Sequence, residues 1–157
     1  HAALHLALLA HGVGADDEVI VPTITFAATA EVVVATGAKP VIVDCRPTDL
    51  AIDFAAVRQA ITPRTKAIIV MHYGGSPVDM HEAMAIKAEY SDISIIEDAA
   101  HAFPAKHELG AIGSIGDSTC FSFYANKTIT TGEGGMLTTN DEDVADHVRR
   151  LSLHGLS

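Results

Sequence analysis

The sequence predicts an α/β fold in which a mostly parallel sheet is covered by helices on both faces. Short apolar runs, such as 18–22 and 93–98, alternate with segments of helical periodicity along the 157-residue chain. The runs are apolar at nearly every position, which is typical of strands buried on both faces. Because the chain contains no linker, repeat or low-complexity stretch, we expect one domain spanning 1–157.

The elements follow one another at short intervals and can be taken in chain order. The predicted helices lie at about 1–11, 27–36, 53–61, 80–90 and 141–151, and the predicted strands at 18–22, 39–44, 62–72, 93–98, 118–123 and 135–140. Glycines at 12 and 14 end the first helix, and the stretch 99–117 has no regular pattern.

Two helices carry more detailed expectations. Thr23 and Thr25 can cap the second helix, and Gly37 follows its last turn. This helix is apolar nearly all round, so we expect it to be buried on more than one side. Asn140 or Asp141 can cap the last helix, whose first turn is acidic and whose last turn carries arginines.

Composition excludes several classes of function. Ten Lys and Arg against 20 Asp and Glu give a formal net charge of −10, which argues against a nucleic acid partner. No apolar run approaches the roughly 20 residues of a membrane span, so no membrane partner is expected. Cys45 and Cys120 lie far apart without metal-type spacing, which favours a reducing, cytoplasmic compartment.

The ends of the chain are unusual. It begins at His1 inside a helical pattern, without Met or a capping residue, and it stops just after a helix. We therefore expect the chain to be a piece of something longer.

Ligands of open parallel sheets bind outside the carboxyl ends of the strands. The residues at those ends are 23–26, 72–75, 98–101 and 122–127. Neither GxGxxG nor GxxxxGK[ST] occurs in the sequence, which disfavours both NAD and nucleoside triphosphates.

Lys127 and Asp98 are the two side chains at these ends that suggest chemistry. Lys127 lies in the polar loop after FSFYAN, where apolar neighbours would favour the neutral amine that attacks carbonyls. Asp98 ends the strand ISIIED, and strand alternation turns Glu97 to the opposite face. A solvated loop lysine and a carboxylate that caps a helix or forms an ion pair are the alternatives. Together, an amine and a carboxylate are the pair that pyridoxal phosphate (PLP) enzymes need.

The sequence resembles the DegT/DnrJ/StrS sugar aminotransferases of PLP fold type I. The resemblance rests on AALHLALLA, DEVIVPTITFAATA, TPRTKAIIVMHYGG, IIEDAAHA, CFSFYANKTITTGEGGMLTTND and LSLHG, which follow one another in family order. It is strongest to the branch that makes 4-amino-4-deoxy sugars, typified by the UDP-4-amino-4-deoxy-L-arabinose aminotransferases. The resemblance implies that the chain covers most of the large, cofactor-binding domain only, truncated at both ends.

The resemblance assigns roles to residues at matching positions. It implies that Lys127 binds PLP covalently, that Asp98 holds the pyridine nitrogen, and that His101 lies near the ring. Taken alone, His101 would be read as a structural histidine.

Three further residues match positions that hold the cofactor. Ser122 matches a phosphate-binding serine, Phe26 an aromatic over the ring, and Ala2 a backbone N–H that binds phosphate at a helix N-terminus. Without the resemblance, Phe26 reads as an apolar anchor before a helix. The family has Gly-Thr before Ala2, whereas this chain has only His1, so the phosphate site is expected to be incomplete.

The function implied is a PLP-dependent aminotransferase acting on a keto sugar nucleotide, with glutamate as amino donor and a homodimer as the complete enzyme. A sugar dehydratase of the same fold is disfavoured, because that branch has histidine where Lys127 stands. An isolated lobe that only oligomerises or binds a partner is the alternative from another class. His1 and His5 lie one helical turn apart, but no third ligand suggests a metal site.

Overall fold

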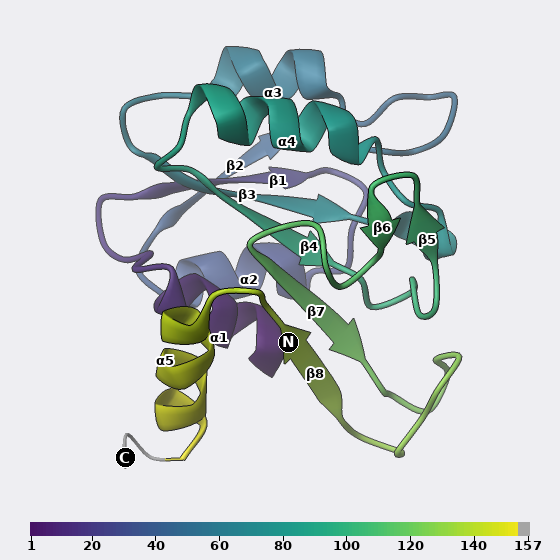
Figure 1. The fold of residues 1–157 in the computed structure, drawn as a ribbon. Coiled ribbons are helices and arrows are strands. Elements are labelled where there is room, and N and C mark those ends of the chain that lie inside the picture. The colour runs from purple at the N-terminus through teal and green to yellow at the C-terminus, as the bar shows by residue number, and fades with distance from the viewer. Residues whose placement is uncertain (154–157) are drawn as a thin grey trace.

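A single mixed sheet forms the centre of the computed structural model, which describes residues 1–153 (Figure 1). Within these residues the sheet has six strands in the order β2-β1-β3-β4-β7-β8. In chain order, the strands are β1 (Glu18–Pro22), β2 (Lys39–Val43), β3 (Thr65–Met71), β4 (Ser94–Asp98), β7 (Ser118–Ser122) and β8 (Gly135–Thr138). All neighbours pair in parallel except β7 and β8. The predicted mostly parallel sheet is confirmed.

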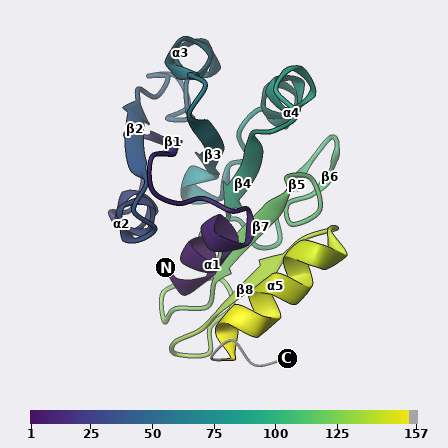
Figure 2. The same cartoon turned by 90° about the vertical axis from the view of Figure 1, so that its left-hand side faces the viewer.

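Helices cover both faces of the sheet, as the sequence predicts. Figure 2 shows α3 (Phe54–Ala60) and α4 (Met80–Glu89) on one side, with α1 (Ala2–Ala10) and α2 (Ala28–Ala35) on the other. α5 (Glu142–Ser152) packs beside α1. It is the longest described helix, with 11 residues. Within residues 1–153, no helix has both the length and the apolar character to span a bilayer.

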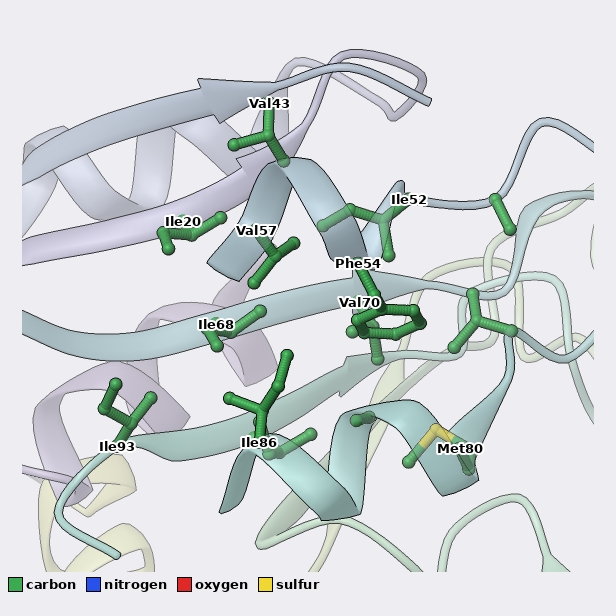
Figure 3. Packing of buried hydrophobic residues seen from close by; sticks show 14 residues of the cluster. Ile20, Val43, Ile52, Phe54, Val57, Ile68, Val70, Met80, Ile86 and Ile93 are labelled. Atoms are coloured by element: carbon green, nitrogen blue, oxygen red, sulfur yellow. The ribbon is translucent and has the colours of Figure 1, made fainter. Parts of the chain in front are cut away.

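The central strand β3 explains why apolar residues occur at every position of these strands. Ile68 and Val70 point into the core under α3 and α4 (Figure 3), whereas Ala67 and Ile69 belong to the core under α1 and α2. Each fully buried aliphatic side chain stabilises the fold by roughly 1.5–3 kcal/mol. A strand between two layers therefore needs apolar residues on both of its faces.

The expected caps of α2 are wrong. Its first flanking residue, Ala27, already has helical angles, and no side chain caps the helix. The Thr23 hydroxyl donates to Asp44 instead. The Thr25 hydroxyl bonds to Thr29 within the first turn. Both hydroxyls therefore bond to side chains, and neither accepts a hydrogen bond from the N–H groups at the start of α2.

Three other expectations concern the burial of α2, the stretch 99–117 and the last helix. α2 is buried on one side only, because Val34 is 61% exposed. The stretch 99–117 contains a short hairpin of β5 (Lys106–His107) and β6 (Gly110–Ala111), which the sequence analysis missed. The last helix is confirmed, and Asp141 accepts hydrogen bonds from the N–H groups of residues 143 and 144. The end of LSLHG, residues 154 and 155, lies outside the described residues.

Candidate functional site

A cavity of ≈ 540 Å³ opens at the carboxyl ends of the parallel strands. Its walls come from the segments that follow β1, β3, β4 and β7, together with the start of α1. Since parallel strands end at the same edge of a sheet, residues far apart in sequence meet here. This is the edge where the sequence predicts a ligand site.

The cavity brings together most of the candidate residues. Five of them line it: Phe26, Asp98, His101, Ser122 and Lys127. The sixth, Ala2, is not among the lining residues, although its neighbours His1 and Ala3 are. Ala2 is the first residue of α1, where backbone N–H groups have no partner within the helix.

Asp98 is the last residue of β4 and is only 4% exposed. Its Oδ2 accepts a hydrogen bond from the Thr29 hydroxyl at 3.0 Å, and its Oδ1 accepts one from the Ala100 N–H at 3.1 Å. Asp98 takes part in none of the ion pairs found within residues 1–153. The ion-pair alternative is therefore not supported, and Asp98 lines the cavity with a hydrogen bond to each of its carboxylate oxygens.

Lys127 lies in the loop between β7 and β8, which is tied at its base. The Phe123 N–H donates to the Gly134 carbonyl at 2.8 Å, and the Thr131 N–H donates to the Phe123 carbonyl at 3.0 Å. The Lys127 N–H closes a turn on the Tyr124 carbonyl at 2.9 Å. Lys127 is half-buried and belongs to none of the ion pairs described in residues 1–153. Its amine is thus available at the cavity wall.

His101 is held by the loop after β3. The Gly74 N–H donates to Nδ1 at 3.3 Å, so the neutral ring carries its proton on Nε2. Burial lowers the pKa of His101, the charge of Lys127 lowers it further, and Asp98 opposes the change. A Cβ on Gly75, whose φ is +86°, would lie 2.9 Å from the His101 carbonyl oxygen. Glycine at 75 therefore permits this close approach.

Ser122 and Phe26 differ in how firmly they are held. Ser122 Oγ accepts a hydrogen bond from the Tyr124 N–H at 3.3 Å, which leaves its own O–H to donate. Phe26 is 75% exposed at the cavity wall. The alternative, in which Phe26 is an apolar anchor before the helix, is therefore not supported, because an anchor would be buried.

Behind the cavity, Glu97 points to the opposite face of β4, as strand alternation predicts. Its Oε1 accepts hydrogen bonds from the Gly116 N–H at 2.8 Å and the Thr119 hydroxyl at 2.7 Å. Its Oε2 accepts one from His72 Nε2 at 2.8 Å, and His72 Nδ1 accepts from the Val78 N–H at 3.2 Å. Burial alone would raise the pKa of Glu97, but these hydrogen bonds outweigh burial and lower it. Glu97 is a fully buried carboxylate with three donors.

Sequence reasoning missed several residues of the site. Tyr73, Tyr124, Asn126 and Glu133 also line the cavity. Thr29 lies behind Asp98 and has no motif of its own. No local signal could have found it, because its contact with Asp98 spans 69 residues.

A second hollow, of ≈ 800 Å³, is larger but carries none of the candidate residues. It is lined by α5 and by Ala10 of α1. No group of three or more His, Cys, Asp and Glu side chains within residues 1–153 is arranged to hold a metal ion. The candidate residues therefore gather at the smaller cavity.

Two curated proteins are similar in sequence to nearly the whole of this chain. The spore coat polysaccharide biosynthesis protein SpsC of Bacillus subtilis (strain 168) is 51% identical over 156 residues, which are 99% of this chain and 40% of SpsC. The GDP-perosamine synthase of Caulobacter vibrioides is 48% identical over 154 residues, 98% of this chain and 41% of that enzyme. The chain thus spans about 40% of the length of these curated relatives.

A solved structure shows the same fold. The PLP-form of Spr1654 from Streptococcus pneumoniae, which was assigned as a sugar aminotransferase, superposes with a TM-score of 0.92 and is 34% identical. The match covers 99% of this chain and 45% of that protein. A model of the DegT/DnrJ/EryC1/StrS aminotransferase family matches residues 1–157. The chain belongs to the DegT/DnrJ/EryC1/StrS aminotransferase family.

Proposed function

We propose that the protein at its natural length is a PLP-dependent sugar aminotransferase that transfers an amino group from glutamate to a keto sugar nucleotide. The observation that carries this proposal is one cavity that joins the amine of Lys127 to the buried carboxylate of Asp98. Residues 1–157 would form its cofactor-binding domain. The family and the PLP-form of a structural relative support the same cofactor.

The cavity has side chains that fit each part of PLP. An amine can meet the aldehyde, a carboxylate the ring nitrogen, a hydroxyl the phosphate and an aromatic side chain the ring face. In the order of these groups, the side chains are Lys127, Asp98, Ser122 and Phe26. The donor set therefore suits the cofactor in chemistry.

Each residue would then have a defined task. Lys127 would bind the cofactor through Nζ, and Asp98 would accept a hydrogen bond from the ring nitrogen and keep its proton there. Ser122 would donate its O–H to the phosphate, helped by the backbone N–H of Ala2 at the start of α1. His101 would present Nε2–H beside the ring.

The same residues would handle the protons of the transfer. When bound, PLP supplies an aldehyde that condenses with primary amines and a ring that accepts electrons from the reacting carbon. Lys127 Nζ would carry a proton to and from that carbon as general base and acid. Asp98, held in a dry environment, would stabilise positive charge on the ring nitrogen more strongly than water does.

The substrate class and assembly extend this proposal to the whole protein. We propose 4-amino sugars destined for cell-envelope glycans as the products. Among the curated relatives, a spore coat polysaccharide biosynthesis protein supports the polysaccharide, and a GDP-perosamine synthase supports the sugar nucleotide. We also propose that the complete enzyme is a homodimer and that it is located in the cytoplasm. Apolar rings left exposed at the cavity wall, those of Phe26, Tyr73 and Tyr124, are consistent with a second copy near the site.

The test is an amino-transfer assay on the protein at its natural length. Glutamate would be offered with a panel of keto sugar nucleotides that differ in nucleotide and keto position, and the amino sugar product measured. Lys127→Met should abolish transfer, by roughly a thousandfold or more. Lys106→Met, which changes an exposed lysine of β5, should retain it. Transfer that survives in Lys127→Met would contradict the proposal.

A further inference from the structure

Thr29 occupies an unusual position for a threonine in a helix. It is 0% exposed, lies in the first turn of α2 and is not among the residues that line the cavity. A buried helical threonine commonly bonds to a carbonyl of the preceding turn. The Thr29 hydroxyl instead donates at 3.0 Å to Oδ2 of Asp98, which is 69 residues away in sequence.

The hydroxyls of two threonines form a chain with one direction. Thr29 has a single hydroxyl proton, and an ionised carboxylate can only accept, so that proton lies toward Asp98. The 2.6 Å hydrogen bond between Thr25 and Thr29 must then be donated by Thr25. Successive donors strengthen one another in a buried site. Two successive hydrogen bonds therefore lead from Thr25, which lines the cavity, through Thr29 to Asp98.

The Thr29 hydroxyl restricts a rotation of the Asp98 side chain that the backbone hydrogen bonds leave free. The Asp98 backbone is held, because its carbonyl accepts from the His72 N–H at 3.1 Å. Oδ1 is held by the Ala100 N–H. Rotation of the carboxylate about its last side-chain bond is then limited by the donor on Oδ2, and within residues 1–153 that donor is the Thr29 hydroxyl.

We propose that Thr29 is a positioning residue, which sets the orientation of the Asp98 carboxylate toward the ring nitrogen of PLP. This inference rests on the proposed function. Thr29 does not line the cavity, and it would act on the ring nitrogen through Asp98, which accepts its hydroxyl proton. It gives α2, whose first residue Ala28 lines the cavity, a part in orienting the Asp98 carboxylate.

The test uses three variants of the protein at its natural length. Thr29→Val keeps the branched shape and removes the hydroxyl, whereas Thr29→Ser keeps the hydroxyl. Thr36→Val is the matched control, because the Thr36 hydroxyl lies at the other end of α2. There it donates to the Val33 carbonyl and accepts from the Ala38 N–H, and neither of these partners lines the cavity. Two properties are measured: the dissociation constant of PLP, and the nitrogen-15 NMR shift of PLP labelled at its ring nitrogen.

The expected pattern separates positioning from a purely structural role. Thr29→Val should weaken PLP binding by about tenfold, the scale of one lost hydrogen bond to a charged group, and should move the nitrogen-15 signal. Thr29→Ser and Thr36→Val should keep the signal within the wild-type range. Wild-type affinity and an unmoved signal in Thr29→Val would overturn the inference.

A double-mutant cycle with Asp98→Asn tests whether the effect passes through Asp98. The tenfold loss from Thr29→Val should disappear in the Asp98→Asn background. An equal loss in both backgrounds would show that Thr29 acts independently, which overturns the inference while leaving the proposed function intact. Wild-type protein that binds no PLP would instead overturn the proposed function itself.

Discussion

The substitution Glu97→Gln tests the buried network that supports the site from behind. Glu97 has three donors: the Gly116 N–H, the Thr119 hydroxyl and His72 Nε2. A glutamine side chain has the same shape, but it offers one oxygen and one NH₂ group. If the oxygen takes the place of Oε1, the NH₂ group faces His72 Nε2–H, and two donors then confront each other.

His72 cannot relieve this conflict by shifting its proton. Its Nδ1 already accepts a hydrogen bond from the Val78 N–H at 3.2 Å, so a proton moved to Nδ1 would face that donor instead. Every arrangement leaves at least one buried donor without an acceptor. Breaking a buried charged partnership of this kind costs about 3 kcal/mol, which lowers the unfolding midpoint by roughly 6–12 °C for a domain of this size.

The assay is thermal unfolding of the wild type and two variants at neutral pH. Glu82→Gln is the matched control, since Glu82 is exposed in the first turn of α4. It should change the free energy of unfolding by no more than about 0.5 kcal/mol. If Glu97→Gln unfolds within the same narrow range as Glu82→Gln, the three hydrogen bonds to Glu97 do not stabilise the fold as argued.

Three further predictions concern charge, pH and the extent of the chain. Asp98→Asn should lower amino transfer by about a hundredfold, as for the loss of one strong electrostatic stabiliser, and unchanged turnover would make Asp98 a structural residue. Hydrogen bonds from Arg64 and Thr62 lower the pKa of Glu18 from 4.5 to about 2. Its stabilisation is therefore complete above pH 4.5 and is lost as the pH falls toward 2. The difference in unfolding midpoint between wild type and Glu18→Gln should shrink over that range, and a constant difference would contradict the reasoning. Residues 1–157 expressed alone should self-associate and show no transfer from glutamate, and turnover equal to that of the natural-length protein in a monomeric sample would refute this.

Most of the fold could be predicted because its inner strands β1, β3 and β4 are buried on both faces. Runs such as 65–71 have no polar face, so their length and their spacing from the helices identify them. β5 and β6 were missed because two-residue strands are too short to have a period. The caps of α2 were predicted wrongly, because the Thr23 hydroxyl bonds to Asp44 and the Thr25 hydroxyl bonds to the side chain of Thr29.

The site was predictable to the extent that it follows from strand ends. Lys127 and Asp98 lie after β7 and at the end of β4, and parallel strands bring those ends together. The partners of these residues were not predictable. Thr29 meets Asp98 across 69 residues, and His72 meets Glu97 across 25. Such contacts depend on how α2 and the loop after β3 pack, which no local pattern encodes.

The most direct test of the proposed chemistry is to locate the amine that binds PLP. The protein at its natural length would be incubated with PLP, reduced with borohydride, digested and mapped by mass spectrometry. Among the five lysines of this chain, the pyridoxyl group should be found on Lys127, which lines the cavity with Asp98. A pyridoxyl group on Lys66 or Lys106 instead, or on no lysine of the chain, would contradict the account.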